Sequence, residues 1–232
     1  MTTIFTRRKA LATGSTFGLT FVGGLSGLSN FALAQDAANT PVPTTVPTDI
    51  PADGPLAELD TRAYVMGDPD APVHVIEYAS LTCPHCARFE TDVLPRLREE
   101  YIDTGKIKFE LREVYFDRLG LWGGMLARCD GGSRYFGIIR LLLERQTDWS
   151  RASSGEEAIT SMRRIGLEAG LSEEQMDECL QDAALAEALV AQYQVHMEEY
   201  EIGGTPSFVI DGELNSNMGY DDFAAKLDEA LG

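Results

Sequence analysis

The sequence predicts a domain of the α/β class across residues 59–232, and three features of the chain indicate that class. An apolar run at 73–79, which contains three β-branched side chains, is typical of a buried strand. Residues 106–114 alternate between apolar and polar side chains, as a half-buried strand does. A long block at 119–200 instead spaces its apolar residues as helices do. Strands interleaved with helices in this way favour an α/β fold.

Residues 1–34 precede this domain and have the pattern of a targeting segment. Basic residues at 7–9 are followed by a glycine-broken apolar stretch at 10–28 and by an A-x-A site that ends at Ala34. We expect a signal peptide that is cleaved after Ala34. The paired arginines resemble a twin-arginine signal, and both that route and the general secretory route stay open.

The next segment, residues 35–58, is rich in Pro and Thr and is expected to be a disordered linker. The whole chain of 232 residues carries a formal net charge of −18. Without the basic residues of the targeting segment, 16 basic and 37 acidic residues remain, a net charge of about −21. This strongly acidic balance argues against nucleic acids and anionic membrane surfaces as partners.

The first part of the domain, residues 60–118, predicts two strands, a helix and a third strand. In order we expect an edge strand at 63–66, a turn at 67–72, a strand at 73–79, a helix that begins at Cys83 and a strand at 106–114. Pro95 is expected to kink the helix because it lacks an N–H group and its ring meets the preceding turn. Gly105 is expected to end that helical stretch.

The middle block is predicted to be entirely helical. Its apolar positions and caps indicate helices at 121–129, 135–143, 156–169, 172–180 and 183–200. Ser172 and Gln175 have the spacing of a capping box, in which each side chain bonds the backbone N–H of the other residue. The aromatic and methionine side chains of this block are expected to form a core rather than a cofactor site.

The last part of the domain predicts a hairpin and a closing helix. We expect a strand at 207–210, a tight turn at Asp211-Gly212, a short strand at 213–214, a loop at 215–219 and an amphipathic helix at 220–231. Pro206 stands where a central strand begins. A proline is tolerated there at the strand start, and a cis peptide bond would suit the entry.

The motif Cys83-Pro84-His85-Cys86 lies where the strand at 73–79 gives way to a helix. Cys83 would be the N-cap and Pro84 the first helical residue, where a missing N–H group is harmless. The unpaired N–H groups and positive dipole end of the helix would then favour the reactive thiolate of Cys83, with His85 as a further nearby cation. Cys86 follows one helical turn later, close enough to form a disulfide with Cys83. The pair can therefore give up or take up two electrons.

Two other uses of this cysteine pair are disfavoured. A structural zinc site needs four ligands, and the remaining cysteines and histidines form no second pair with suitable spacing. A purely structural disulfide is also disfavoured, because a small ring at a helix start is a poor cross-link. A redox role is therefore the preferred interpretation.

The stretch from Glu77 to Cys86, together with Gly204-Thr205-Pro206-Ser207-Phe208, resembles the DsbA-type thiol:disulfide oxidoreductases of the thioredoxin superfamily. The resemblance covers about residues 60–232. It implies a thioredoxin-like fold with an inserted helical subdomain at about 119–200. It also implies that Pro206 is cis and packs against the cysteine pair, and that the Thr205 backbone pairs with an extended peptide substrate. The threonine before this proline resembles isomerase-type members of the superfamily as much as it resembles the best-known oxidases.

Glu77 is a carboxylate in an otherwise apolar strand. It is either a charged strand end in solvent or a buried acid whose raised pKa lets it relay the proton of Cys86. DsbA-type proteins carry such an acid at the matching position, paired with a lysine on the next strand. Lys108 is the first candidate for that partner and Arg112 the second. In their strand, Ile107, Phe109 and Leu111 are expected on one face, with Lys108, Glu110 and Arg112 on the other.

Cys129 and Cys179 lie on different predicted helices and have no activating context. A structural disulfide between them is favoured, with two buried free thiols as the alternative. If bridged, they would close a loop of about 50 residues and contribute ~4 kcal/mol in the chain-entropy model.

The resemblance implies a periplasmic oxidase that introduces disulfide bonds into exported proteins through Cys83 and Cys86. No cofactor or metal is expected, and the expected state is a monomer. Implied partners are reduced exported proteins and a quinone-linked membrane oxidase that restores the disulfide. A disulfide isomerase or reductase is the first alternative. It is disfavoured because isomerases usually dimerise through an N-terminal domain, and only a linker is expected here. A non-enzymatic metal- or peptide-binding module is the second.

Overall fold

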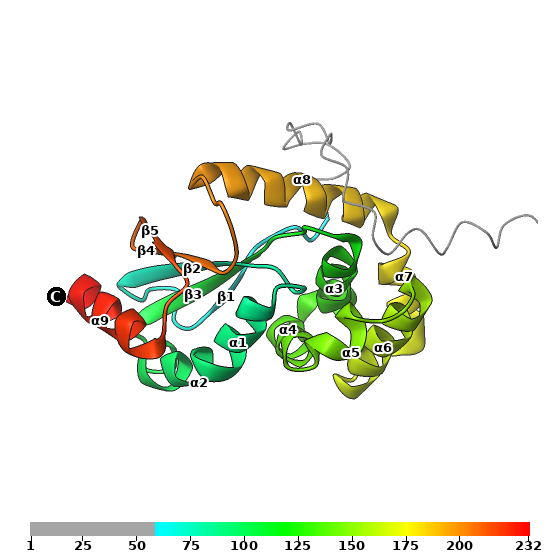
Figure 1. Ribbon diagram of the computed structural model, residues 1–232, viewed down its shortest axis with the longest axis horizontal. Coiled ribbons are helices and arrows are strands. Elements are labelled where there is room, and N and C mark those ends of the chain that lie inside the picture. The colour runs from blue at the N-terminus through cyan, green and yellow to red at the C-terminus, as the bar shows by residue number, and fades with distance from the viewer. Residues whose placement is uncertain (1–58) are drawn as a thin grey trace, which may run out of the picture. The chain divides into compact units, whose positions relative to one another are not determined.

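The computed structural model describes residues 59–232, and the predicted targeting segment and linker lie outside these residues. A five-stranded sheet in the order β1-β3-β2-β4-β5 forms the centre (Figure 1). Its strands are β1 (Tyr64–Met66), β2 (Val73–Ala79), β3 (Ile107–Glu113), β4 (Ser207–Ile210) and β5 (Glu213–Ser216). Only β2 and β3 run parallel among these strands, and the other neighbouring pairs are antiparallel. The predicted strands are confirmed, except that β5 continues into the expected loop.

Helices cover both faces of the sheet (Figure 1). One face packs against α1 (Pro84–Asp92), α2 (Leu94–Leu97) and the closing helix α9 (Tyr220–Leu231), around the buried rings of Phe89, Phe109, Phe208 and Phe223. The other face lies under the long helix α8 (Ala183–Glu199), where Ile76, Tyr78 and Val209 are buried. The sheet is thus the middle layer of three.

The helix after Cys83 is interrupted where the sequence predicts. The backbone breaks at Val93, resumes for one turn in α2, and ends in a π-helical turn at Arg98–Ile102. Pro95 explains the break because its nitrogen has no hydrogen to donate to the preceding turn.

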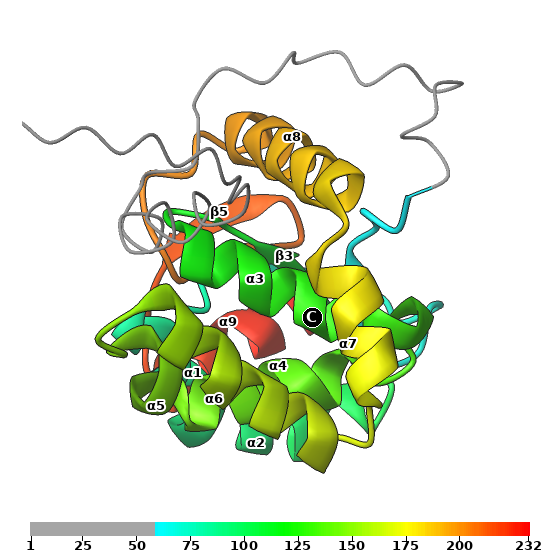
Figure 2. The same cartoon turned by 90° about the vertical axis from the view of Figure 1, so that its right-hand side faces the viewer.

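Between β3 and β4 the chain inserts the predicted helical subdomain, which faces the viewer in Figure 2. Its helices are α3 (Arg118–Arg128), α4 (Tyr135–Glu144), α5 (Gln146–Ser150), α6 (Gly155–Glu168) and α7 (Glu173–Leu180). The Ser172–Gln175 capping box is present at the start of α7. The five-residue helix α5 is an addition that the apolar spacing did not indicate. This arrangement is a thioredoxin-like fold with a helical insertion.

The chain returns from α8 to the sheet through a cis peptide bond between Thr205 and Pro206, as the sequence predicts. Within residues 59–232, the helices are too short or too polar to cross a membrane.

Candidate active site

The two cysteines of the Cys83-Pro84-His85-Cys86 motif occupy different environments at the start of α1. Cys83 is the extended N-cap residue, and Pro84 opens the helix. Both thiols are free, but Cys83 is half-buried whereas Cys86 is only 1% exposed. An approaching thiolate can therefore reach the outer sulfur, Cys83, and not the inner one.

Hydrogen bonds to the sulfur of Cys83 lower the pKa of its thiol to about 5. The largest contribution comes from the thiol of Cys86, which donates to the Cys83 sulfur, and the Thr205 side chain and the backbone N–H groups of Cys86 and His85 add to it. Partial burial opposes this shift. The two backbone N–H groups are the unpaired donors at the helix start that the N-cap position exposes to an anion.

Cys86 responds in the opposite direction. Its pKa is raised because it donates its proton to Cys83, because it is buried, and because the charges of Glu77 and Cys83 repel its thiolate. The reduced pair is consequently one thiolate and one thiol, with the thiolate on the accessible sulfur.

The cis-proline loop packs directly against the outer cysteine. The Sγ atom of Cys83 lies 3.3 Å from the carbonyl oxygen of Thr205, to which the protonated thiol can donate. The carbonyl favours the thiol form, whereas the Thr205 side chain favours the thiolate, and the thiolate form prevails. The structure therefore brings Thr205 and Pro206 to the cysteine pair from more than 100 residues away in the chain.

His85 is exposed, and its Nδ1 atom accepts a 2.7 Å hydrogen bond from the guanidinium of Arg88. The backbone N–H of His85, rather than its ring, is what lowers the pKa of Cys83.

Glu77 is a buried acid, 4% exposed, on the face of β2 that α1 covers. Its pKa is raised well above the usual range by burial and by the negative charges of Glu90 and Cys83. The side chain lies on the lining of a cavity of about 630 Å³ between the sheet, α1, α2 and α4. Buried residues such as Leu111 and Ile139 line it together with exposed ones such as Thr91 and Gly137. Water can therefore approach this acid from outside.

The proposed partners of Glu77 were wrong. In the parallel register Glu77 lies opposite Leu111, whereas Lys108 lies opposite His74 and Arg112 opposite Tyr78. Alternate residues of a strand point to opposite faces, so both basic side chains lie on the other side of the sheet from Glu77. Lys108 instead donates to the carbonyl oxygen of Pro69 at 3.3 Å.

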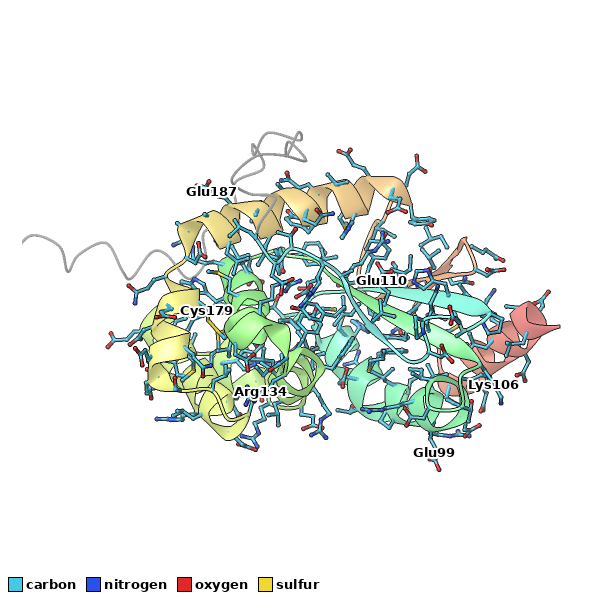
Figure 3. The ribbon with its side chains drawn as sticks, turned by 180° about the vertical axis from the view of Figure 1, so that it is seen from behind. Glu99, Lys106, Glu110, Arg134, Cys179 and Glu187 are labelled. Atoms are coloured by element: carbon cyan, nitrogen blue, oxygen red, sulfur yellow. A yellow bond between two sulfur atoms is a disulfide. The ribbon has the colours of Figure 1, made fainter. Side chains whose placement is uncertain are left out.

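Arg112 belongs to a polar cluster on the α8 side of the sheet. It bonds Glu110 at 2.5 Å and the Tyr78 hydroxyl at 2.8 Å, and Figure 3 marks Glu110 in this layer. The acids that line the cavity with Glu77 are Glu90 of α1 and Glu144 of α4. Burial and the charge of Glu144 raise the pKa of Glu90 to about 7.

Cys129 and Cys179 are joined by a disulfide that links the turn after α3 to α7 (Figure 3). Their Cα atoms are 5.5 Å apart, within the normal range for a disulfide. This bond lies inside the helical subdomain and joins none of the residues of the Cys83 site.

Sequence reasoning missed two side chains that touch the cysteine motif. Gln146 of α5 donates to the carbonyl oxygens of Leu81 and Cys83, and Asp117 accepts from the hydroxyl of Thr82. Both come from the helical subdomain, far away in sequence. In residues 59–232, no three His, Cys, Asp or Glu side chains are grouped closely enough to hold a metal ion.

Comparison with known proteins places this geometry in a family. A thioredoxin family model matches residues 60–229. A Rickettsia bellii protein named a protein-disulfide oxidoreductase is 32% identical over 175 residues, which are 75% of this chain and 66% of that protein. The chain spans 62–66% of the length of the Rickettsia relatives that it matches.

Solved structures agree with the family match. The crystal structure of Wolbachia pipientis alpha-DsbA1 has a TM-score of 0.66 and 27% identity, over 73% of this chain and 91% of that one. Oxidised BdbD from Bacillus subtilis shares the fold with a TM-score of 0.63 and 21% identity, over 72% of this chain and 91% of that chain. The chain therefore belongs to the thioredoxin family, and within it to the DsbA-like proteins.

Proposed function

We propose that this protein is a thiol:disulfide oxidoreductase that introduces disulfide bonds into exported proteins through Cys83 and Cys86. The observation that carries the proposal is the opposite shift of the two cysteine pKa values, with the lowered value on the accessible sulfur. A stabilised Cys83 thiolate is a good leaving group, and it favours the reduced pair over the disulfide. A couple of this kind oxidises other thiols.

The exchange begins with the oxidised pair. A substrate thiolate attacks the Sγ atom of Cys83, the Cys83–Cys86 bond breaks, and its electron pair passes to the sulfur of Cys86. A second substrate thiolate then attacks the substrate sulfur of this mixed disulfide, and Cys83 leaves as a thiolate. The substrate has lost two electrons and its thiol protons. The protein has gained the two electrons and one proton, on Cys86.

Glu77 is the proposed source of that proton. Burial and nearby negative charges raise the pKa of its carboxyl well above the usual range, and the carboxyl acts electrostatically on the Cys86 thiolate. The acid would donate to the new Cys86 thiolate and recover a proton from water in the adjoining cavity. On reoxidation the same path would carry the proton outward.

The substrate would lie along the cis-proline loop. The Thr205 carbonyl is next to the reactive sulfur, so an extended peptide that pairs with this backbone brings its cysteine to Cys83. We expect reduced exported proteins as substrates, a quinone-linked membrane oxidase as the partner that restores the disulfide, and a monomer in the periplasm. The targeting pattern of residues 1–34 supports export.

The test uses the oxidised full-length chain and a reduced, unfolded protein with several cysteines. The proposal predicts stoichiometric loss of substrate thiols, and a Cys86→Ser variant that accumulates a mixed disulfide through Cys83. Cys83→Ser should do neither. Rearrangement of already mispaired disulfides without net oxidation would favour the isomerase, and absence of any exchange would leave a binding module.

A further inference from the structure

The helical subdomain is bonded directly to the segment that carries the reactive cysteine. Leu81, Thr82 and Cys83 form the junction between β2 and α1. Each of the three accepts or donates a side-chain hydrogen bond with a residue between β3 and β4. These three consecutive residues are therefore held by a part of the chain that contains neither Cys83 nor Cys86.

Gln146 makes two of these bonds. Its Nε2 atom donates to the carbonyl oxygen of Leu81 at 2.8 Å and to that of Cys83 at 2.9 Å. The side chain belongs to a residue only 7% exposed, so the amide has little water to replace these acceptors. Both protons of the amide nitrogen are used, which fixes the orientation of the group.

Asp117 makes the third bond while capping α3. One carboxylate oxygen accepts from the Thr82 hydroxyl at 2.6 Å, and the other accepts from the backbone N–H of Gly120 at 2.8 Å. A carboxylate that is held by its own helix start is a fixed acceptor. The hydroxyls of Thr82 and Ser80 are 3.2 Å apart, which extends the chain of bonds to the end of β2.

Close packing accompanies the hydrogen bonds. Leu81 is buried against Gly123 of α3. A Cβ atom added at Gly123 would lie 2.7 Å from the Cδ1 atom of Leu81. The helix can approach this closely because the position is glycine. The junction therefore has little freedom to move away from the subdomain.

We propose that Gln146 and Asp117 are positioning residues that hold Cys83 at the start of α1, where helix N–H groups and the Cys86 thiol meet its sulfur. This inference rests on the proposed function and adds a role for the inserted subdomain. The subdomain would set how oxidising the pair is, because stabilisation of the thiolate depends on where the sulfur lies. If the junction loosens, Cys83 loses part of that stabilisation and the disulfide becomes favoured.

The experiment compares Gln146→Leu and Thr82→Val with Trp149→Phe in the full-length chain. Gln146→Leu removes two bonds to the junction, and Thr82→Val removes one while leaving the Asp117 cap intact. Trp149→Phe is the matched control. Trp149 lies in the same helix as Gln146, and the change removes the 2.9 Å bond from its indole to the Leu142 carbonyl of α4 without removing a bond to the junction. The readouts are thiolate absorbance at 240 nm against pH, equilibrium with glutathione, and thermal unfolding.

For Gln146→Leu we expect the acid dissociation constant of the Cys83 thiol to fall about fivefold, with a comparable shift of the glutathione equilibrium toward the disulfide. Thr82→Val should give a smaller change of about twofold in the same direction. Trp149→Phe should lower the unfolding temperature and leave both constants unchanged.

The inference is overturned if Gln146→Leu and Thr82→Val unfold earlier but keep the wild-type titration and equilibrium. It is also overturned if Trp149→Phe shifts the titration as much as Gln146→Leu does. The titration of Cys83 needs no substrate. A wild-type chain that does not oxidise proteins would therefore count against the proposed function while still giving a result on Gln146.

Discussion

The two cysteine pairs of this protein have the same side chains and opposite properties. Cys83 and Cys86 are three residues apart at a helix start, both thiols are free, and their pKa values move in opposite directions. Cys129 and Cys179 are 50 residues apart, are joined, and connect two parts of the helical subdomain. Sequence separation and the surrounding donors, rather than the residue type, decide which pair can exchange electrons with a substrate.

The comparison shows how different surroundings for two cysteines make one sulfur a stable thiolate and keep the other a thiol. At the first pair, hydrogen bonds stabilise one thiolate while burial and Glu77 keep the other sulfur protonated. At the second pair, each sulfur lies near a backbone carbonyl oxygen, that of Met125 or Met176, and the bond restricts the unfolded chain. Four predictions test this division, from the largest expected effect to the smallest.

The largest expected difference is between substitutions in the first cysteine pair and substitutions in the second, measured as the rate of protein oxidation. Cys83→Ser is expected to abolish protein oxidation, because no accessible sulfur remains to form the mixed disulfide. The double variant Cys129→Ala with Cys179→Ala should keep the rate within about twofold, since neither residue contacts the motif. Both are measured as the rate of thiol loss from a reduced protein. Comparable losses in the two variants would remove the distinction between the pairs.

The second pair should matter instead for stability. Removal of the Cys129–Cys179 bond, which closes a loop of 50 residues, is expected to lower the free energy of unfolding by ~4 kcal/mol. Denaturant titration of the double alanine variant and the parent, with Cys83 and Cys86 reduced in both, measures this. A difference below about 1 kcal/mol would mean that the subdomain needs no cross-link.

Glu77→Gln should weaken the asymmetry of the first pair, because the charge of Glu77 helps to raise the pKa of Cys86. The change keeps the size of the side chain and removes its proton, so the step that protonates or deprotonates Cys86 is expected to slow about tenfold. Because a buried acid with a raised pKa destabilises the fold as pH rises above its unfolded value, the variant should also be the more stable protein at pH 8. Stopped-flow exchange and denaturant titration test both parts. If the exchange rates stay unchanged while stability increases, Glu77 destabilises the fold and takes no part in proton transfer.

A smaller effect concerns pH and stability. The pKa of Cys83 is lowered from 9.0 to about 5, so its thiolate stabilises the reduced fold fully above pH 9 and progressively less as pH falls to 5. The oxidised protein lacks this titration. The unfolding temperature of the reduced form, relative to the oxidised form, should therefore fall by a few degrees between pH 8 and pH 5. A difference that stays constant over this range would show that the Cys83 thiolate is not stabilised by the fold.

Local patterns in the sequence predicted much of this structure. The strand before Cys83, the N-cap position, the kink at Pro95 and the Ser172 capping box depend on neighbours within a few residues, and all were found. The cis bond at Pro206 was also predicted, because few backbone arrangements admit proline at a strand start.

Contacts between distant segments were harder to predict. Gln146 and Asp117 meet the motif only after the subdomain folds against it, and α5 is too short to give a periodic pattern. The pairing of Glu77 with Lys108 failed for a simpler reason. Alternation within the strand puts Lys108 on the opposite face from Leu111, and the parallel register pairs Leu111 with Glu77, so Lys108 points away from Glu77.

The most direct test of the proposed oxidase is the redox potential of the Cys83–Cys86 couple in the full-length protein, measured against glutathione with Cys129 and Cys179 followed separately. The thiolate stabilisation at Cys83 predicts a strongly oxidising couple, at or above about −150 mV. A potential at or below about −220 mV would mean that the disulfide is the favoured form. The protein would then act as a reductase or isomerase, and its pair would not be the oxidant proposed here.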